Sequence, residues 1–209
     1  MQAEAQYPPR HYIEYDRQSL LAAVRAHPLA TFVVANEALP YATPLPMVLL
    51  AESEPVAPSL LAHLDANNPV VQFMRDGLAG LAVFRGPSSY ISPNDYTTRQ
   101  LPTYNYVEVQ ALGKVQLLDR ATTRADLLRL SAAMEAEPER RLRADDPRID
   151  PLLDQVLGFR LTDLQLTGRF KLSQDKRLAD REAAWTKLQA SCPHLRLEAP
   201  PSVRLAERP

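Results

Sequence analysis

The sequence predicts a mainly β fold with peripheral helices, arranged as an antiparallel barrel. Segments with strand character are concentrated between about residues 29 and 118, and segments with helical periodicity follow them. One further strand-like segment at residues 157–166 comes late enough to complete the sheet. Strands first and helices afterwards favour an antiparallel barrel over a doubly wound parallel sheet. Neither a G-x-G-x-x-G motif nor a P-loop occurs in the sequence to support the parallel alternative.

Strands are predicted from apolar runs and from alternation of apolar and polar residues. The strand-like segments are residues 29–35, 41–50, 60–64, 80–85, 106–118 and 157–166. A polar turn at residues 36–37 joins the first two. Pro44 and Pro46 place the second strand at a sheet edge or a bulge, because proline cannot donate to a central ladder. Gly113 predicts a kink in the fifth strand, and Asp163 interrupts the alternation of the last.

Helices are predicted from capping residues and from apolar residues at three- and four-residue spacing. Asp16 can cap a helix that ends near residue 26, because its carboxylate accepts hydrogen bonds from the N–H groups of the first turn. Asn68, followed by Pro69 at the first helical position, can open a helix over the sequence VVQFMRD. The later helices are expected at residues 122–136, at 149–157 and around 183–190.

Length and charge set limits on organisation and partners. We expect a single domain with helical additions over residues 1–192 and a proline-rich C-terminal tail over residues 193–209. The formal net charge of −1 provides no positive field for a nucleic-acid backbone, so direct DNA binding is only weakly supported. No apolar signal core occurs near the N-terminus, and no stretch approaches the roughly 20 apolar residues of a membrane span. We therefore expect a cytoplasmic protein with no membrane partner.

Cysteine and histidine usage argues against a metal centre. Cys192 is the single cysteine, which excludes an internal disulfide and a cysteine-rich zinc site. The four histidines lie far apart in the sequence and show no metal-ligand spacing. No metal site is predicted.

Residues 84–106 form the most informative stretch of the chain. Four of the eight tyrosines fall within it, together with serine and threonine hydroxyls on a proline-stiffened segment that we expect to be mostly loop. Aromatic faces and hydroxyls gathered in this way suit a planar polar ligand or a partner subunit. The alternative is a structured loop whose tyrosines cover the edge of the core.

Four motifs carry a family resemblance. They are YATPLP at residues 41–46, HLDANNP at 63–69, FRGPSSYISPNDY with LPTYNYVEV within 84–109, and GRFKLSQDK at 168–176. Their order, wording and spacing resemble the PaiB family of FMN-binding negative transcriptional regulators, over nearly the whole chain. The run of GPxxYISPxxY, PTxNY and KLSQxK is specific in combination.

The resemblance implies a six-stranded antiparallel split β-barrel that forms a homodimer, with FMN held in a cleft at the subunit interface. In such barrels the flavin ring packs against backbone and apolar groups, while hydroxyl and basic groups take the phosphate. By position in the motifs, the candidate cofactor-binding residues are Thr43, His63, Asn68, Arg85, Ser92, Thr103, Asn105, Lys171 and Gln174. Taken by itself, Arg85 is either an anion ligand or one half of a structural ion pair.

The sequence departs from the family pattern at Ala66, Ser88 and Asp95, where basic or bulky groups are usual. Three functions therefore stay open: a homodimeric FMN-binding transcriptional repressor, a flavin-dependent oxidoreductase or flavin reductase, and a family member that has lost FMN. Asp95 and Glu108 are the acidic residues of the motif region, but no partner marks either as an acid or a base. Catalytic residues are consequently not assigned.

Overall fold

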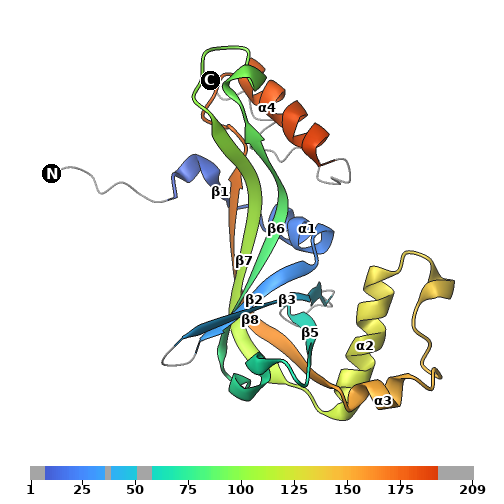
Figure 1. The fold of residues 1–209 in the computed structure, drawn as a ribbon. Helices are drawn as coiled ribbons and strands as arrows, with labels where there is room; N and C mark the ends of the chain where they lie inside the picture. The colour runs from blue at the N-terminus through green and yellow to red at the C-terminus, as the bar shows by residue number, and fades with distance from the viewer. Residues whose placement is uncertain (1–7, 36–38, 51–57, 193–209) are drawn as a thin grey trace. The chain divides into compact units, whose positions relative to one another are not determined.

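The structure is a computed structural model that describes residues 8–35, 39–50 and 58–192 (Figure 1). Its strands are β1 (Ile13–Glu14), β2 (Leu29–Ala35), β3 (Pro40–Pro46), β4 (Val48–Leu49), β5 (Leu60–Asp65), β6 (Ala79–Ile91), β7 (Thr103–Leu117) and β8 (Val156–Lys171). Within the described residues they form one sheet of eight strands in the order β3-β2-β6-β7-β8-β5-β4, and β1 pairs with β8. The predicted fold class is confirmed, although six strands were expected.

β1 was not predicted, and the strand predicted at residues 41–50 is divided into β3 and β4; β1 and β4 are two residues long each. Strands this short carry too few residues to show alternation in the sequence. The late strand β8 lies between β7 and β5 and so completes the sheet as predicted. β3 stands at one end of the strand order, which is the edge position that its prolines require.

Helices and short 3-10 turns connect these strands. They are η1 (Arg10–Tyr12), α1 (Arg17–Ala26), η2 (Pro69–Phe73), η3 (Pro93–Asp95), α2 (Arg120–Met134), η4 (Pro138–Arg140), α3 (Ile149–Leu153) and α4 (Leu178–Ser191). Both predicted caps are present: Asp16 accepts from the N–H of Ser19 at 2.9 Å, and Asn68 accepts from the N–H of Val70 at 3.0 Å. None of the helices in the described part of the chain is long and apolar enough to cross a membrane.

The chain divides into two compact units, each described here by itself. The first comprises Met1–His27, Phe84–Gln110 and Leu166–Pro209, and the second Pro28–Val83 and Ala111–Gln165. The single domain predicted over residues 1–192 stays a prediction. The predicted tail at 193–209 and the turn at 36–37 lie outside the described residues.

The second unit has an aromatic centre and a helical flank. The rings of Phe32 and Phe159 lie 5.0 Å apart between centroids, and a Cβ at Gly80 would meet the Phe32 ring at 2.8 Å. On the flank, α2 and α3 lie side by side (Figure 1) and share a buried cluster around Leu127 and Ile149. Close packing therefore fixes glycine at position 80, since larger side chains have no room.

A buried carboxylate ties α2 of the second unit to the sheet. Arg160 of β8 donates two hydrogen bonds to Asp126, at 2.7 and 2.8 Å, and Arg129 donates a third at 2.6 Å. Burial opposes ionisation of Asp126, but the hydrogen bonds from both arginines outweigh it and hold its pKa below the usual value. The ion pair between Asp126 and Arg160 therefore links α2 to β8.

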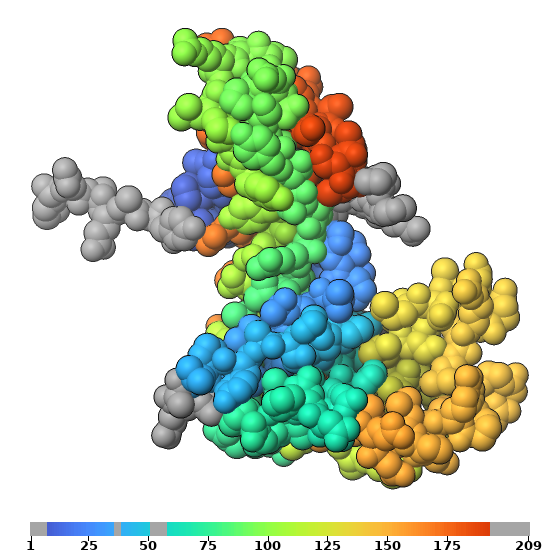
Figure 2. Space-filling model, viewed as in Figure 1, coloured from blue at the N-terminus to red at the C-terminus, as the bar shows by residue number. Residues whose placement is uncertain are grey.

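In the first unit, α4 packs against the end of β6 and the segment that follows it. Figure 2 shows α4 (red) against these atoms (green), and Ala184 shares a buried cluster with Ile91 and Tyr96. Asp180, fully buried in the first turn of α4, accepts hydrogen bonds from the N–H groups of Thr97 and Thr98 at 2.7 and 3.0 Å. Their hydroxyls add two more bonds to the same carboxylate. The segment between β6 and β7 is thereby anchored.

Three predicted element boundaries are wrong. The expected loop at residues 84–106 is largely strand, because β6 continues to Ile91 and β7 begins at Thr103. The helix after Asn68 is the five-residue 3-10 turn η2. The helix predicted at 149–157 ends at Leu153, and β8 begins at Val156. At residues 84–106 the side chains alternate between buried and exposed positions, but the proline, serine and tyrosine residues there do not show this as an apolar and polar alternation in the sequence.

Candidate functional site

In the first unit, the outer face of three neighbouring strands carries aromatic and charged side chains. Along the start of β7, Asn105, Val107 and Val109 point inward and are buried, so the alternate residues Tyr104, Tyr106, Glu108 and Gln110 face outward. On β8 the outward-facing residues of this unit are Thr167, Arg169 and Lys171. Outward polar residues on antiparallel strands are ordinary, but the grouping of tyrosines with charged groups of both signs is distinctive.

The alternation of buried and exposed residues along β6 shifts beside a hollow on this face. Gly80, Ala82 and Phe84 are buried, whereas beyond Arg85 and Gly86 the buried positions are the odd-numbered ones. A change of parity by one residue is the signature of a β-bulge, which turns two successive residues toward one face. A Cβ at Gly86 would meet Cβ of Val107 at 3.0 Å, so glycine permits the close approach of β7.

The larger hollow has a volume of about 400 Å³. It is lined by Arg85, Gly86 and Ser88 of β6 and by Tyr104, Tyr106, Val107 and Glu108 of β7. This volume lies in the lower part of the range of roughly 300–1,000 Å³ that ligand pockets occupy. The hollow is therefore large enough for a small-molecule ligand.

Arg85 is the charged residue of this hollow with the clearest capacity for a ligand. Its side chain is exposed, and it has no hydrogen-bond or ion-pair partner among the described residues. The structure therefore shows no ion pair for Arg85 among the described residues, and its role as an anion ligand stays a prediction. A guanidinium group in this position can donate two parallel hydrogen bonds to a phosphate.

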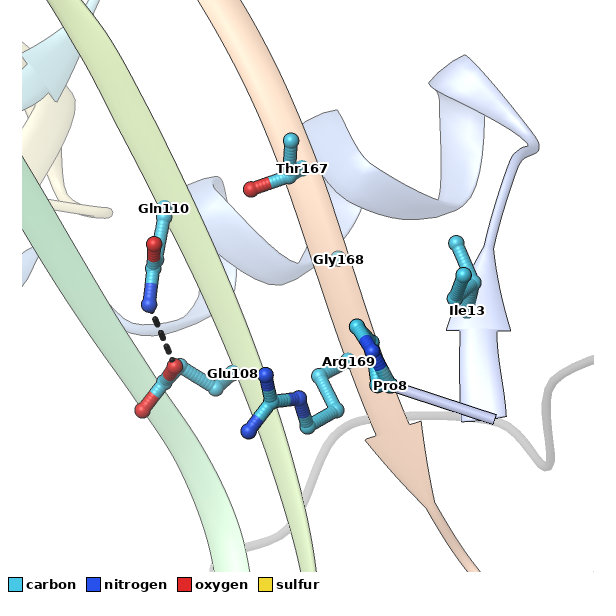
Figure 3. Close-up of a pocket in the computed structure, with 7 residues that line it drawn as sticks. All are labelled: Pro8, Ile13, Glu108, Gln110, Thr167, Gly168 and Arg169. Carbon is cyan, nitrogen blue, oxygen red and sulfur yellow. Dashed lines mark hydrogen bonds between the residues drawn. The ribbon is translucent and has the colours of Figure 1, made fainter. Parts of the chain in front are cut away.

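A smaller hollow of about 220 Å³, drawn in Figure 3, shares a lining residue with the larger one. Its lining residues are Pro8, Ile13, Glu108, Gln110, Thr167, Gly168 and Arg169. Glu108 lines both hollows, and the side-chain amide of Gln110 donates to its carboxylate at 2.9 Å. Arg169 extends from β8 toward Glu108 (Figure 3) and donates to the Tyr106 hydroxyl at 3.5 Å.

Lys171 and Thr103, both predicted cofactor-binding residues, are brought into direct contact. The Lys171 ammonium donates to the Thr103 hydroxyl and lies 6.0 Å from the centroid of the Tyr12 ring. Burial lowers the pKa of Lys171, and the nearby charge of Asp175 partly offsets that effect. Burial also raises the pKa of Tyr12 to about 12, reinforced by Asp175, to which its hydroxyl donates at 3.2 Å.

The KLSQDK motif folds into a turn that uses its polar side chains internally. Ser173 has a positive φ of 63° and is buried, and the side-chain amide of Asn105 donates to its hydroxyl at 3.0 Å. The Tyr96 hydroxyl lies 3.1 Å from the same oxygen. Gln174 accepts from the N–H of Leu172 at 2.7 Å and donates to the backbone carbonyl of Phe170 in β8. Asn105 and Gln174 thus hold the turn, and cofactor binding by either stays a prediction.

Ser92 acts at the start of η3. Its hydroxyl accepts from the N–H of Asn94 at 3.2 Å, while Asp95 accepts from the N–H of Ser92 at 2.8 Å. This reciprocal pair is a capping box. Asp95, which departs from the family pattern, therefore has a structural role in this chain.

The other three predicted residues belong to the second unit. The side-chain amide of Asn68 donates to the Thr43 hydroxyl at 3.1 Å, which joins η2 to the edge strand β3. His63 on β5 is half-buried beside Thr123 and Asp126, and burial lowers its pKa. Among the predicted residues, the structure brings together Lys171 with Thr103 and Thr43 with Asn68. Arg85 is the one of the nine that lines the larger hollow.

The candidate site also contains residues that the sequence did not single out as ligands. Tyr106, Glu108 and Arg169 line the two hollows, together with Gly86. The sequence TYNYVEVQ at residues 103–110 could have predicted this grouping, because alternate residues of a strand share a face, which puts Tyr104, Tyr106 and Glu108 together. Within the described residues, no group of three or more histidine, cysteine, aspartate or glutamate side chains could hold a metal ion.

Comparison with known families assigns the chain to a protein family. A model of the family described as "Putative FMN-binding domain" matches residues 6–162, and the chain belongs to that family. The curated protein named Protease synthase and sporulation protein PAI 2, from Bacillus subtilis (strain 168), is 23% identical over 177 residues, covering 83% of this chain and 84% of that protein. The predicted PaiB-type family and flavin cofactor are thereby confirmed.

Solved structures agree on the fold. The FAD and heme binding protein from Mycobacterium smegmatis superimposes with a TM-score of 0.60 and 16% identity, covering 77% of this chain and 73% of that one. The flavocytochrome Anf3 from Azotobacter vinelandii gives a TM-score of 0.55 and 13% identity, covering 99% and 82%. At these identities the similarity concerns the fold, which is the flavin-binding split-barrel class that the sequence predicted.

Proposed function

We propose that the chain binds FMN in the larger hollow of the first unit. The observation that carries this proposal is the exposed Arg85 guanidinium, which has no partner among the described residues and lies in a hollow with Tyr104 and Tyr106. The guanidinium is suited to the phosphate, and the tyrosine faces are suited to a planar ring. Bound FMN would supply hydride- or electron-transfer chemistry, while the chain would bind and orient it.

The departures from the family pattern do not close this hollow. Ser88 lines it with a small side chain, and Asp95 caps η3 through the backbone of Ser92. Neither residue projects a bulky group into the space. These observations favour retention of flavin over the alternative in which the cofactor has been lost.

The same face supports a homodimer. Tyr90 and Tyr104 are each 53% exposed, and Leu101, which lies close to Tyr104 in the sequence, is 84% exposed. Exposed tyrosines are enriched at protein interfaces, where the ring is buried and the hydroxyl finds a partner. We infer that two copies meet through this face in the cytoplasm and act as a negative transcriptional regulator. The regulatory role is what the resemblance of the four sequence motifs to the PaiB family implies.

Titration of the purified protein with FMN, followed by flavin fluorescence, tests the binding proposal. The wild type should bind FMN, and Ser88→Leu, which fills the larger hollow, should bind it at least tenfold more weakly. Arg99→Ala is the matched control, because Arg99 is an exposed residue of the same unit outside both hollows. FMN binding that is equally strong in Ser88→Leu would refute the location.

Two further measurements address assembly and regulation. Light scattering should give twice the chain mass for the wild type and a monomer for Tyr104→Asp, because an aspartate would place a charge in the interface. An electrophoretic shift assay at moderate salt tests direct DNA binding. A sequence-independent result there would remove the direct repressor while leaving flavin binding intact.

A second candidate function is a flavin-dependent oxidoreductase or flavin reductase. The smaller hollow favours it, because it gives a second small molecule a place beside the cofactor. Oxidation of NADH or NADPH in the presence of added FMN is the assay. A rate no higher than that of free FMN would exclude the reductase.

A further inference from the structure

Glu108 is the acidic residue that lines both hollows of the first unit. Its carboxylate accepts one hydrogen bond from the described residues, that of the Gln110 amide at 2.9 Å (Figure 3). Among those residues it forms no ion pair, although Arg85 lines the larger hollow with it. An ionised carboxylate can accept about four hydrogen bonds, so Glu108 has acceptor capacity left for a ligand.

The position of Glu108 on β7 relates its carboxylate to the tyrosines of the larger hollow. Tyr106 and Glu108 are alternate residues of one strand, so they share a face and lie about 7 Å apart along β7. Val107 between them is buried on the opposite face. A planar ring that packs on Tyr106 therefore has an edge within reach of the Glu108 side chain.

The chemistry of the flavin ring decides which of its edges suits a carboxylate. The pyrimidine edge of the oxidised ring carries a single N–H, that of the imide, with a carbonyl on each side. The dimethylbenzene edge has no hydrogen-bond donor, and a carboxylate covered by it would lose hydrogen bonds to water without replacement. The imide N–H can donate to Glu108 in a charge-assisted hydrogen bond. Gln110 has a second amide N–H, which can donate to a carbonyl beside the imide.

We propose that Glu108 accepts a hydrogen bond from the imide N–H of the flavin ring and so orients the ring with its pyrimidine edge toward this residue. This inference rests on the proposed function, because it assigns a role within the same hollow. Arg85 and Glu108 line that hollow without forming an ion pair, so one is free for the phosphate and the other for the imide. Arg169 keeps its hydrogen bond to the Tyr106 hydroxyl and has no part in this contact. Glu108 thus selects rings that carry an N–H donor at that edge.

A comparison of two ligands in two proteins tests the hydrogen bond. The ligands are FMN and 3-methyl-FMN, in which a methyl group replaces the imide hydrogen, and flavin fluorescence reports binding. The wild type should bind 3-methyl-FMN about tenfold more weakly, as expected for loss of one hydrogen bond to a charged group. In Glu108→Met, which keeps the volume without a strong acceptor, the two affinities should differ by less than about threefold. An equal preference for FMN in both proteins would overturn the inference, because a purely steric effect of the methyl group would persist in that variant.

The charge of Glu108 provides a second readout. A carboxylate at the pyrimidine edge opposes the negative charge that the ring gains on reduction, so Glu108→Gln should make the reduction potential of bound FMN more positive. Glu182→Gln is the matched control and should leave the potential unchanged, because Glu182 is an exposed glutamate of the same unit outside both hollows. An unchanged potential in Glu108→Gln would contradict the inference. A wild type that binds no FMN would overturn the proposed function as well, whereas FMN binding without either effect would overturn this inference alone.

Discussion

Replacement of Arg85 tests the phosphate contact on which flavin binding is argued to depend. The side chain is exposed and has no partner among the described residues, so Arg85→Ala leaves no buried group unpaired. The cost to binding is then the ligand contact alone. A hydrogen bond to a charged group contributes about 1.5–3 kcal/mol, which corresponds to roughly 10- to 150-fold in affinity. Solvent exposure and salt place the expected loss near the lower end, at about 10- to 30-fold.

Riboflavin provides the internal control, because it has the same ring system without the phosphate. Arg85→Ala should weaken FMN binding by this factor and change riboflavin binding by less than about twofold. Arg85→Lys should give an intermediate FMN affinity, since lysine keeps the charge but loses the two parallel hydrogen bonds. Fluorescence titration of both flavins measures these values. Equal losses for FMN and riboflavin would refute the phosphate role.

Three further predictions concern stability, each measured by urea denaturation. Gly86→Ala should destabilise the fold by about 1–3 kcal/mol, because the new Cβ would lie 3.0 Å from that of Val107. An unchanged free energy of unfolding would contradict this, because it would mean that β6 and β7 move apart at no cost. Asp126→Ala should cost about 3 kcal/mol by leaving Arg160 without its carboxylate, whereas Asp145→Ala, which breaks an exposed ion pair, should change the stability far less. The Nε2 atom of His27 is buried and has no hydrogen-bond partner among the described residues, and burial lowers the pKa of the imidazole. As the pH falls, the imidazole is therefore protonated in the unfolded chain at a higher pH than in the folded protein. The free energy of unfolding should therefore fall as pH drops below about 6.5, and His27→Leu should flatten that slope; an unchanged slope would contradict the role of His27 and assign the pH dependence to His63.

Much of the fold could be predicted because local signals and tertiary structure agree. Asp16 and Asn68 correctly predicted the helix caps, and the prolines of β3 correctly predicted an edge strand. Asp163, which interrupts the alternation of β8, adopts a positive φ of 53°. The buried positions of β8 are odd-numbered around Leu161 and even-numbered beyond it, so the interruption marks a change of face.

The site could be predicted only in part, because motif position does not tell which face of a strand a residue occupies. Asn105 and Tyr104 are neighbours in one motif, yet Asn105 is buried in the turn network and Tyr104 faces the hollow. The change in burial parity at Arg85 and Gly86 decides which residues of β6 face outward, and the sequence pattern alone does not reveal it. Such information lies in tertiary contacts and is absent from composition and spacing.

The most direct test of the account is an experimental structure of the protein crystallised with FMN. The account predicts flavin in the hollow between β6 and β7, with its phosphate within hydrogen-bond distance of Arg85 and its ring against Tyr104 or Tyr106. Flavin bound elsewhere, with the Arg85 side chain directed to solvent, would contradict it.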